Sequence, residues 1–250
     1  MIIFLYGADD YRSREKLREF KEKFRREVDP AGNSLEVVDA ENIDASRLDQ
    51  MLASPSLFAS KRMIVVENIF RNQKEVRQEV LALLQKKKKK KEDLDNIIIF
   101  WEGAESKFRA GEKMYEWLKQ QKFVQEFKSL SNQAVQGWVR QEVQRQGMEI
   151  RAAAANLLAG YFGSNLWQLR QELDKITAYK RASLQASGQK PAEGQRPVIT
   201  DQDVRDMSRG NVDENIFAFT DALCRKNQKL ALTTLEKEIE AGVSDTYLMY

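Results

Sequence analysis

The sequence has 250 residues, 42% of them hydrophobic, so the chain is long enough for a substantial core and for more than one domain. It carries 41 basic and 38 acidic residues, and the formal charge of +3 gives the whole molecule no strong electrostatic preference for nucleic acid. Because the chain has no histidine and a single cysteine, Cys224, the usual zinc sites, catalytic triads and internal disulfides are excluded. No apolar run reaches the length of a membrane span, and residues 1–5 lack the basic lead of a secretion signal, so we expect a cytoplasmic protein without a membrane partner.

Strand and helix patterns alternate along the first half of the chain. Short apolar runs predict strands at residues 2–6, 35–38, 63–66, 97–101 and 123–127. Amphipathic patterns between them predict helices around residues 17–24, 48–52, 76–84 and 114–118. Strands that are apolar throughout are typical of a parallel sheet covered on both faces. Residues 1–130 are therefore predicted to form an open α/β domain.

Helical patterns alone continue after Leu130. Ser131 is a good cap for a first helix, and further helices are predicted at residues 152–162 and 166–176. The segment from Arg181 to Pro197 is rich in small and polar residues and predicts a flexible loop, followed by a short helix capped by Thr200 or Asp201. We expect a helical domain over residues 131–210 and, over residues 211–250, the truncated start of a third, all-helical domain.

The first strand, Gly7 and the first helix follow one another as in phosphate-binding loops. The loop pattern G-x-x-x-x-G-K-[ST], aligned on Gly7, requires Gly, Lys and Ser or Thr where this chain has Arg12, Ser13 and Arg14. The two aspartates shortly after Gly7 would also repel phosphates. We expect a degenerate turn that only positions the first helix; an unorthodox nucleotide contact is the alternative.

Two large apolar side chains occupy the turn between a predicted helix and a predicted strand. Pro55 ends the helix, and Ser56, Leu57 and Phe58 follow before the strand begins at Met63. Adjacent residues of a turn point in different directions, so Leu57 and Phe58 are not both expected to reach the core of their own chain. Two interpretations stay open: both side chains are buried internally, or at least one contacts a partner.

The lysine run from Lys86 to Lys91 is the strongest local charge cluster. Like charges on successive residues repel, which predicts that the helix end splays into a mobile tip. A contact with DNA phosphates is the alternative.

Several segments taken in order resemble the delta subunit family of the bacterial DNA polymerase III clamp loader. They are I-I-F-L-Y-G-A-D-D-Y at the start, residues 52–68, residues 127–139, V-I-T-D-Q-D-V and residues 215–223. The resemblance implies an AAA+ type α/β fold with a degenerate nucleotide site, a helical lid domain and a C-terminal collar domain. Two departures from active ATPases agree with it: Glu67-Asn68 stands in place of a metal-binding Asp-Glu pair, and Trp167 stands where lids place a sensor arginine.

The resemblance also implies a function for the exposed turn. In delta subunits the matching hydrophobic pair inserts into the sliding clamp, the beta subunit, and delta opens the ring for loading onto primed DNA. The expected clamp-binding residues are Pro55, Ser56, Leu57, Phe58, Lys61 and Arg62. Leu57 and Phe58 would provide most of the binding energy, and Ser56, Lys61 and Arg62 would fit only the opened clamp.

No intrinsic catalysis, cofactor or metal is expected; polymerase activity would belong to the holoenzyme as a whole. The implied partners are the clamp, the ATPase subunits and delta-prime of a hetero-pentamer, and primer-template DNA indirectly or weakly, in a bacterial nucleoid-associated replisome. An AAA+ type ATPase is the first alternative. A DNA-binding scaffold that uses Lys86 to Lys91 is the second.

Overall fold

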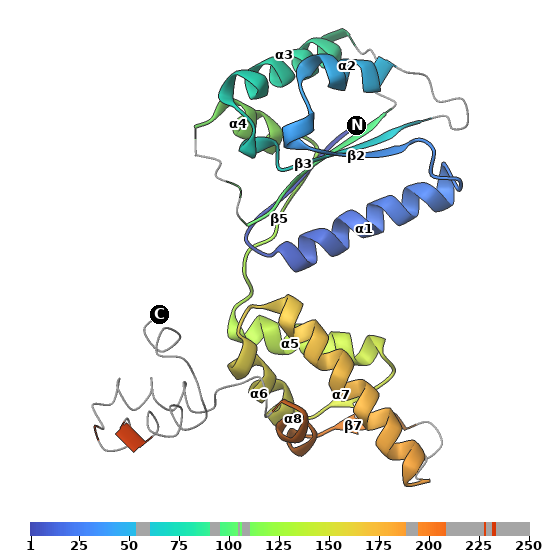
Figure 1. Cartoon of the computed structure of the whole chain (residues 1–250), viewed down its shortest axis with the longest axis vertical. Helices are drawn as coiled ribbons and strands as arrows, with labels where there is room; N and C mark the ends of the chain where they lie inside the picture. Colours follow the sequence, from blue (N-terminus) through green and yellow to red (C-terminus); the bar gives the residue numbers. More distant parts are fainter. Residues whose placement is uncertain are drawn as a thin grey trace. The chain divides into compact units, whose positions relative to one another are not determined.

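The computed structural model describes residues 1–53, 61–90, 96–104, 106, 111–188 and 195–208, with residues 228, 232 and 233. The chain divides into two compact units, Met1–Ser129 and Leu130–Tyr250, each of which we describe by itself (Figure 1). Apart from those three isolated positions, the third domain expected at residues 211–250 lies outside the described residues.

Strands and helices alternate in the first unit. Its strands are β1 (Ile2–Tyr6), β2 (Leu35–Asp39), β3 (Met63–Glu67), β4 (Ile97–Glu102) and β5 (Phe123–Glu126). Its helices are α1 (Asp10–Glu27), α2 (Ala45–Ala53), α3 (Lys74–Lys90) and α4 (Lys113–Lys119), with the 3-10 turns η1 (Ala40–Asn42) and η2 (Ile69–Arg71). The carboxylate of Asp44 caps α2 by accepting a hydrogen bond from the backbone N of Arg47, 2.7 Å away.

All strand pairs of this sheet are parallel, in the order β2-β3-β4-β1-β5. Central β4 pairs Phe100 with Phe4 of β1 on one side and with Val66 of β3 on the other. From β1 the chain crosses to the edge strand β2 on the β4 side of the sheet, whereas β5 lies on the other side of β1. The strand order therefore reverses at β1, and a crevice can form at its carboxyl end. Ligand sites of open α/β sheets form at such a point.

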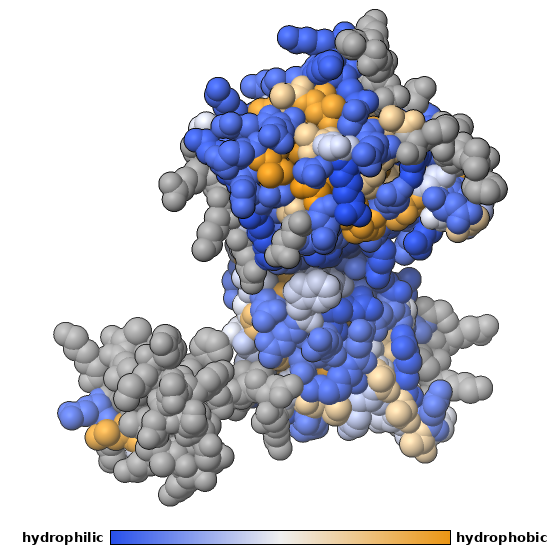
Figure 2. All heavy atoms as spheres, turned by 45° about the horizontal axis from the view of Figure 1, so that its top comes forward, coloured by the Kyte–Doolittle hydropathy of each residue, from blue (hydrophilic) through white to orange (hydrophobic). Residues whose placement is uncertain are grey.

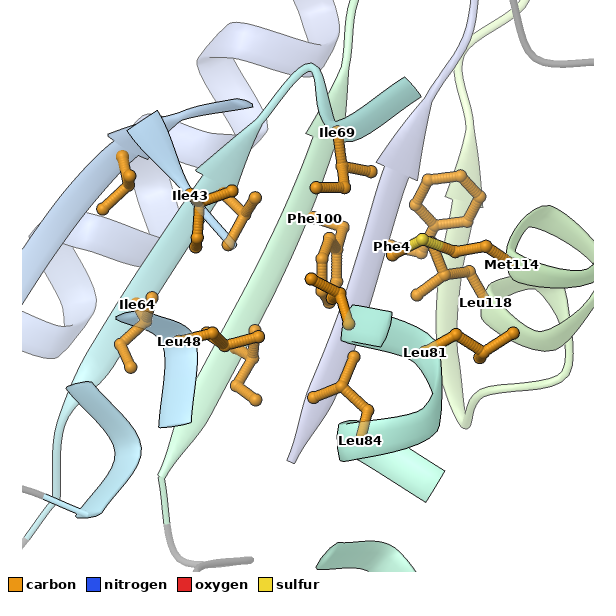
Figure 3. Close-up of a cluster of buried hydrophobic side chains, with 14 of the residues drawn as sticks. Phe4, Ile43, Leu48, Ile64, Ile69, Leu81, Leu84, Phe100, Met114 and Leu118 are labelled. Atoms are coloured by element: carbon orange, nitrogen blue, oxygen red, sulfur yellow. The ribbon is translucent and has the colours of Figure 1, made fainter. Parts of the chain in front are cut away.

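Each face of the sheet has its own apolar cluster, as expected for strands without a polar side. On one face, α2, α3 and α4 pack over alternate strand residues such as Phe4, Ile64 and Phe100 (Figures 1 and 3). On the other face, α1 packs with Leu17 and Phe24 against the intervening residues of the same strands. The predicted α/β fold with a parallel, doubly covered sheet is confirmed.

Helix α3 corrects the expectation that the lysine run splays. It continues through five of the six lysines and ends at Lys90. Lysines in the last turn of a helix interact favourably with the negative end of its dipole, and this offsets part of their mutual repulsion. The Nζ of Lys87 is also 2.8 Å from a carboxylate oxygen of Asp49 on α2.

The second unit is mainly helical. It contains α5 (Asn132–Arg145), α6 (Ala152–Phe162), α7 (Leu166–Ala186) and α8 (Asp201–Ser208), with the two-residue strands β6 (Glu149–Ile150) and β7 (Val198–Ile199). The hydroxyl of Ser131 caps α5 by accepting a hydrogen bond from the N of Ala134, and the Oγ1 of Thr200 accepts from the N of Asp203 in the first turn of α8. Both helix starts lie where the sequence predicts them.

Two local predictions for this unit are wrong. Helix α7 extends to Ala186, so the first part of the loop expected from Arg181 is helical. The strand pair β6-β7 was not expected, because two residues are too few to show an alternating pattern. Neither change affects the helical class of the unit. Among the described residues, no helix is long and apolar enough to cross a membrane.

Candidate functional site

The turn after β1 is closed by groups of the first unit itself. Gly7 has φ +137°, and a Cβ at this position would lie 2.3 Å from the carbonyl oxygen of Phe127, so the backbone requires glycine. The carboxylate of Asp9 accepts hydrogen bonds from the backbone N and the Nε of Arg12, at 2.9 and 2.6 Å. Arg12 also donates to the carbonyl oxygen of Lys128 at 2.6 Å. The turn is thereby tied to the segment that follows β5.

The start of α1 is therefore already occupied by an anion. The N-terminus of a helix attracts phosphate through its free N–H groups and its dipole. Here the buried carboxylate of Asp9 takes that position and uses one of those N–H groups. A phosphate would have to displace this carboxylate or approach it against charge repulsion.

Ser13 and Arg14, the other two residues of the degenerate loop, contact the ends of β3 and β4. The Oγ of buried Ser13 accepts a hydrogen bond from the indole Nε1 of Trp101 at 3.1 Å. The guanidinium of Arg14 lies 3.5 Å from the centre of the Trp101 ring and pairs with Glu67 at 2.7 Å. The residue expected in place of a metal-binding acid is thus part of an internal ion pair.

The loop after β4 is attached to the same helix. The Oδ1 of Asp10 accepts a hydrogen bond from the backbone N of Ala104 at 2.6 Å. Gly103 leaves space for the Trp101 ring, since a Cβ there would lie 2.8 Å from it. The first turn of α1 therefore joins the carboxyl ends of β3 and β4 through the side chains of its own residues.

Glu102, the last residue of β4, is a buried carboxyl group at this edge of the sheet. Burial raises its pKa to about 7, although hydrogen bonds from Ser106 and from the backbone of η2 oppose the shift. The hydroxyl of Ser106 donates to Oε2 at 2.5 Å, and the N of Phe70 lies 3.4 Å from Oε1. The sequence pattern gives no sign of this buried carboxyl, because only its position at the end of the folded strand shows its burial.

The expected clamp-binding turn lies largely outside the described residues. This applies to Pro55, Ser56, Leu57 and Phe58. Of the remaining two residues of the set, Lys61 is exposed, and Arg62, whose side chain is 13% exposed, forms an ion pair with Glu36 of β2.

Asn96 connects the two sides of this turn. Its side-chain Nδ2 donates to the carbonyl oxygen of Leu52 at 3.3 Å, and its Oδ1 accepts from the backbone N of Arg62 at 3.0 Å. Its own carbonyl oxygen accepts from the N-terminal amine of Met1 at 2.5 Å. One amide side chain thus fixes the chain just before and just after residues 54–60. The signal in the sequence was a polar residue directly before a buried strand, which is too common to identify such a contact.

Trp167, which the sequence comparison places at the sensor position of the lid, is the second residue of α7 and is 51% exposed. A hydrophobic indole cannot provide the charge with which an arginine would contact a nucleotide phosphate. In the part of the chain that the structure describes, no group of His, Cys, Asp or Glu residues could hold a metal ion.

These features define a class: a five-stranded parallel α/β unit, in which side chains of the unit itself fill the turn after β1, in a chain that continues into a helical unit. No protein-family model and no curated protein matches the chain. Solved structures do. The Bacillus subtilis DNA clamp loader delta protein (YqeN) matches with a TM-score of 0.62 and 16% identity, over 99% of this chain and 70% of that chain.

A second similar structure is the Thermotoga maritima RuvB Holliday junction branch migration motor. It matches with a TM-score of 0.51 and 11% identity, over 92% of this chain and 73% of that chain. At these identities the likeness shows a shared fold. The predicted AAA+ type fold, and the structural resemblance to a clamp loader delta protein, are confirmed.

Proposed function

We propose that this chain is the delta subunit of a bacterial clamp loader, which binds the sliding clamp and opens its ring. The observation that carries the proposal is the structural likeness to the Bacillus subtilis delta protein over 99% of the chain. In the turn after β1, the carboxylate of Asp9 takes the position that a nucleotide phosphate would need. This supports a subunit that works without binding a nucleotide itself. The protein would have no catalytic activity of its own and would act in the cytoplasm within the replisome.

The proposed partners follow from the same assignment. They are the clamp, the ATPase subunits and delta-prime of a hetero-pentamer, and primer-template DNA. In this arrangement the ATPase subunits would provide the nucleotide chemistry of the complex. Contacts with them would involve mainly the proposed third domain over residues 211–250.

The proposed contact with the clamp is formed by Leu57 and Phe58. Burying both side chains would contribute about 3 to 6 kcal/mol before costs, enough for the central anchor of a small interface. Asn96 supports this assignment, because it fixes both flanks of the segment that carries the pair.

Opening the ring requires more than binding. A ligand shifts an equilibrium only by its difference in affinity for the two states, so the subunit must bind the opened clamp more tightly than the closed clamp. We assign this difference to the polar residues beside the anchor. Lys61 is exposed and can contact the clamp directly, whereas Arg62 is paired with Glu36 and would act by holding the segment in place. Ser56 completes the proposed set.

The test is the affinity for the sliding clamp of a variant with Leu57→Ala and Phe58→Ala. We expect the dissociation constant to rise roughly hundred-fold, because a loss of about 3 kcal/mol of apolar burial corresponds to two powers of ten. Val37→Ala removes an exposed apolar side chain of β2 and serves as the matched control. Wild-type affinity of the double variant would refute the proposed clamp contact.

A further inference from the structure

Helix α6 carries no charged side chain on any side. One face is buried in the second unit and consists of Ala154, Ala155, Leu158, Ala159 and Phe162. The outward face is also mostly apolar and consists of Ala153, Asn156, Leu157, Gly160 and Tyr161. Elsewhere hydrophilic side chains cover much of the surface that Figure 2 shows, as is usual for elements that face water. A helix that is apolar all round is typical of a buried position, so we expect the outward face of α6 to be covered.

This outward face forms one side of a groove. Helix α8 packs beside α6 and lines the groove with Asp201 and Arg205. The groove has a volume of about 580 Å³. Proteins bind ligands in spaces of about 300 to 1,000 Å³, so the groove is large enough for several side chains. Its mostly apolar lining with charged groups on one side fits an amphipathic helix.

The chain leaves α8 beside this groove. Ser208, the last residue of α8, is buried, and its hydroxyl donates to a carboxylate oxygen of Glu172 on α7 at 3.2 Å. Arg205 of the groove lies three residues earlier, which is about 4.5 Å along the helix. The point from which the chain continues is therefore held within about one helical turn of the groove.

The sequence that follows α8 has the pattern of an amphipathic helix. Residues 209–227 lie outside the part of the chain that the structure describes. In their sequence Ile216, Phe219 and Leu223 recur at helical spacing, and Phe217 widens the same apolar stripe. Such a stripe requires an apolar surface to pack against.

The connection to this sequence is short. Only residues 209–212 separate α8 from Asp213, and they include Gly210-Asn211, a pair typical of turns. Short connections place consecutive helices side by side and antiparallel. Four residues span up to about 14 Å, and the eight residues of α8 are about 12 Å long. A helix that returns along α8 can therefore reach the whole groove.

We propose that the groove between α6 and α8 is the docking site of residues 213–224 of the same chain, which lie in it as a helix antiparallel to α8. The apolar stripe covers the outward face of α6. This direction also brings Asp213 and Glu214, at the start of the segment, close to the opposite charge of Arg205. The contact does not depend on the proposed clamp contact, because that contact uses residues of the first unit.

The single cysteine of the chain makes the contact testable. Cys224 directly follows Leu223, at the edge of the apolar stripe. The variant Gly160→Cys places a second thiol in the groove, at a position with open space for a Cβ. A short bismaleimide should link the two thiols within one full-length chain, as detected by mass spectrometry of the digested protein.

Gly137→Cys is the matched control. Gly137 lies inside α5 of the same unit, also has open space for a Cβ, and does not line the groove. The Gly160→Cys variant should be linked at least roughly ten-fold faster than this control, because docking raises the effective concentration of one thiol near the other.

A charge reversal tests the direction of the docked segment. In the Gly160→Cys variant, the further change Arg205→Glu should slow the linking roughly two- to five-fold, the effect of losing a surface ion pair. Adding Asp213→Lys and Glu214→Lys should restore the rate, because the charges are then opposite again. Failure to restore it would show that the segment does not lie antiparallel to α8.

Two further results would overturn the inference. One is an equal linking rate in the Gly160→Cys and Gly137→Cys variants, which would mean that the segment around Cys224 does not occupy the groove. The other is a link that joins two chains and increases with protein concentration, which would make a second copy the occupant. Clamp affinity of the Gly160→Cys variant should equal that of the wild type, so the outcome is independent of the proposed function.

Discussion

Asn96 joins three separate points of the first unit, and its role in the proposed clamp contact can be tested by one substitution. Asn96→Ala removes the hydrogen bonds to Leu52 and Arg62, worth about 1 kcal/mol each. We expect clamp affinity to fall roughly ten-fold or less, because the two flanks of the anchor lose a common support. Clamp titration and thermal unfolding measure the two effects.

Asn72 provides the matched control for this variant. Its Nδ2 also donates to two carbonyl oxygens, those of Ala40 and Ile43, at 2.7 and 3.0 Å. Asn72→Ala should cost similar stability and leave clamp affinity unchanged. If both variants lost clamp affinity equally, the effect would be one of general stability, and Asn96 would have no positioning role.

Single residues were predictable from the sequence where a local rule applies. The caps at Ser131 and Thr200 follow from residue type and position, and so does the absence of a phosphate loop at Arg12, Ser13 and Arg14. What those loop residues do instead was not predictable. The partners of Arg12 and Ser13 include Lys128 and Trp101, which are far away in the sequence and come close only in the folded sheet.

At the scale of elements, the end of β4 gives a pH-dependent contribution to stability. The pKa of Glu102 is about 7 in the folded protein against an ordinary value of 4.5. Between these two pH values the folded form keeps a proton that the unfolded form releases. The free energy of unfolding therefore falls as the pH rises through this interval, by about 3 kcal/mol in total.

The variant Glu102→Gln isolates this contribution. It should unfold with nearly wild-type stability at about pH 5, where Glu102 is protonated, and should be more stable than the wild type at about pH 8. Denaturant unfolding at the two pH values measures the difference. An identical pH dependence of wild type and variant would contradict the assignment.

Element type was largely predictable, and element length was less so. The parallel sheet follows from five apolar runs separated by helical patterns, and both apolar clusters are where those runs place them. The prediction that the end of α3 splays was wrong. It took account of repulsion between the lysines but omitted the helix dipole and the pairing of Lys87 with Asp49 on α2. The clamp-binding turn stays a prediction, since residues 54–60 lie outside the described part of the chain.

At the scale of the whole molecule, the AAA+ type fold and the proposed lack of nucleotide dependence can be separated by experiment. We expect millimolar Mg-ATP to shift the melting temperature by less than about 1 °C, because a ligand stabilises a protein only in proportion to its binding to the folded state. Differential scanning fluorimetry measures the shift, with an ATPase of the same fold as a positive control. A saturable upward shift would favour the ATPase alternative.

The carboxylate of Asp9 at the start of α1 has a consequence for timing. A protein whose conformation depends on nucleotide needs a site that alternates between a nucleotide-bound and a nucleotide-free state. Here the carboxylate of Asp9, which is part of the chain itself, takes the anion position, so under the proposed function we expect no nucleotide-dependent switch within this chain. We expect the ATPase subunits of the proposed complex, which hydrolyse nucleotide, to set when this chain binds and releases the sliding clamp.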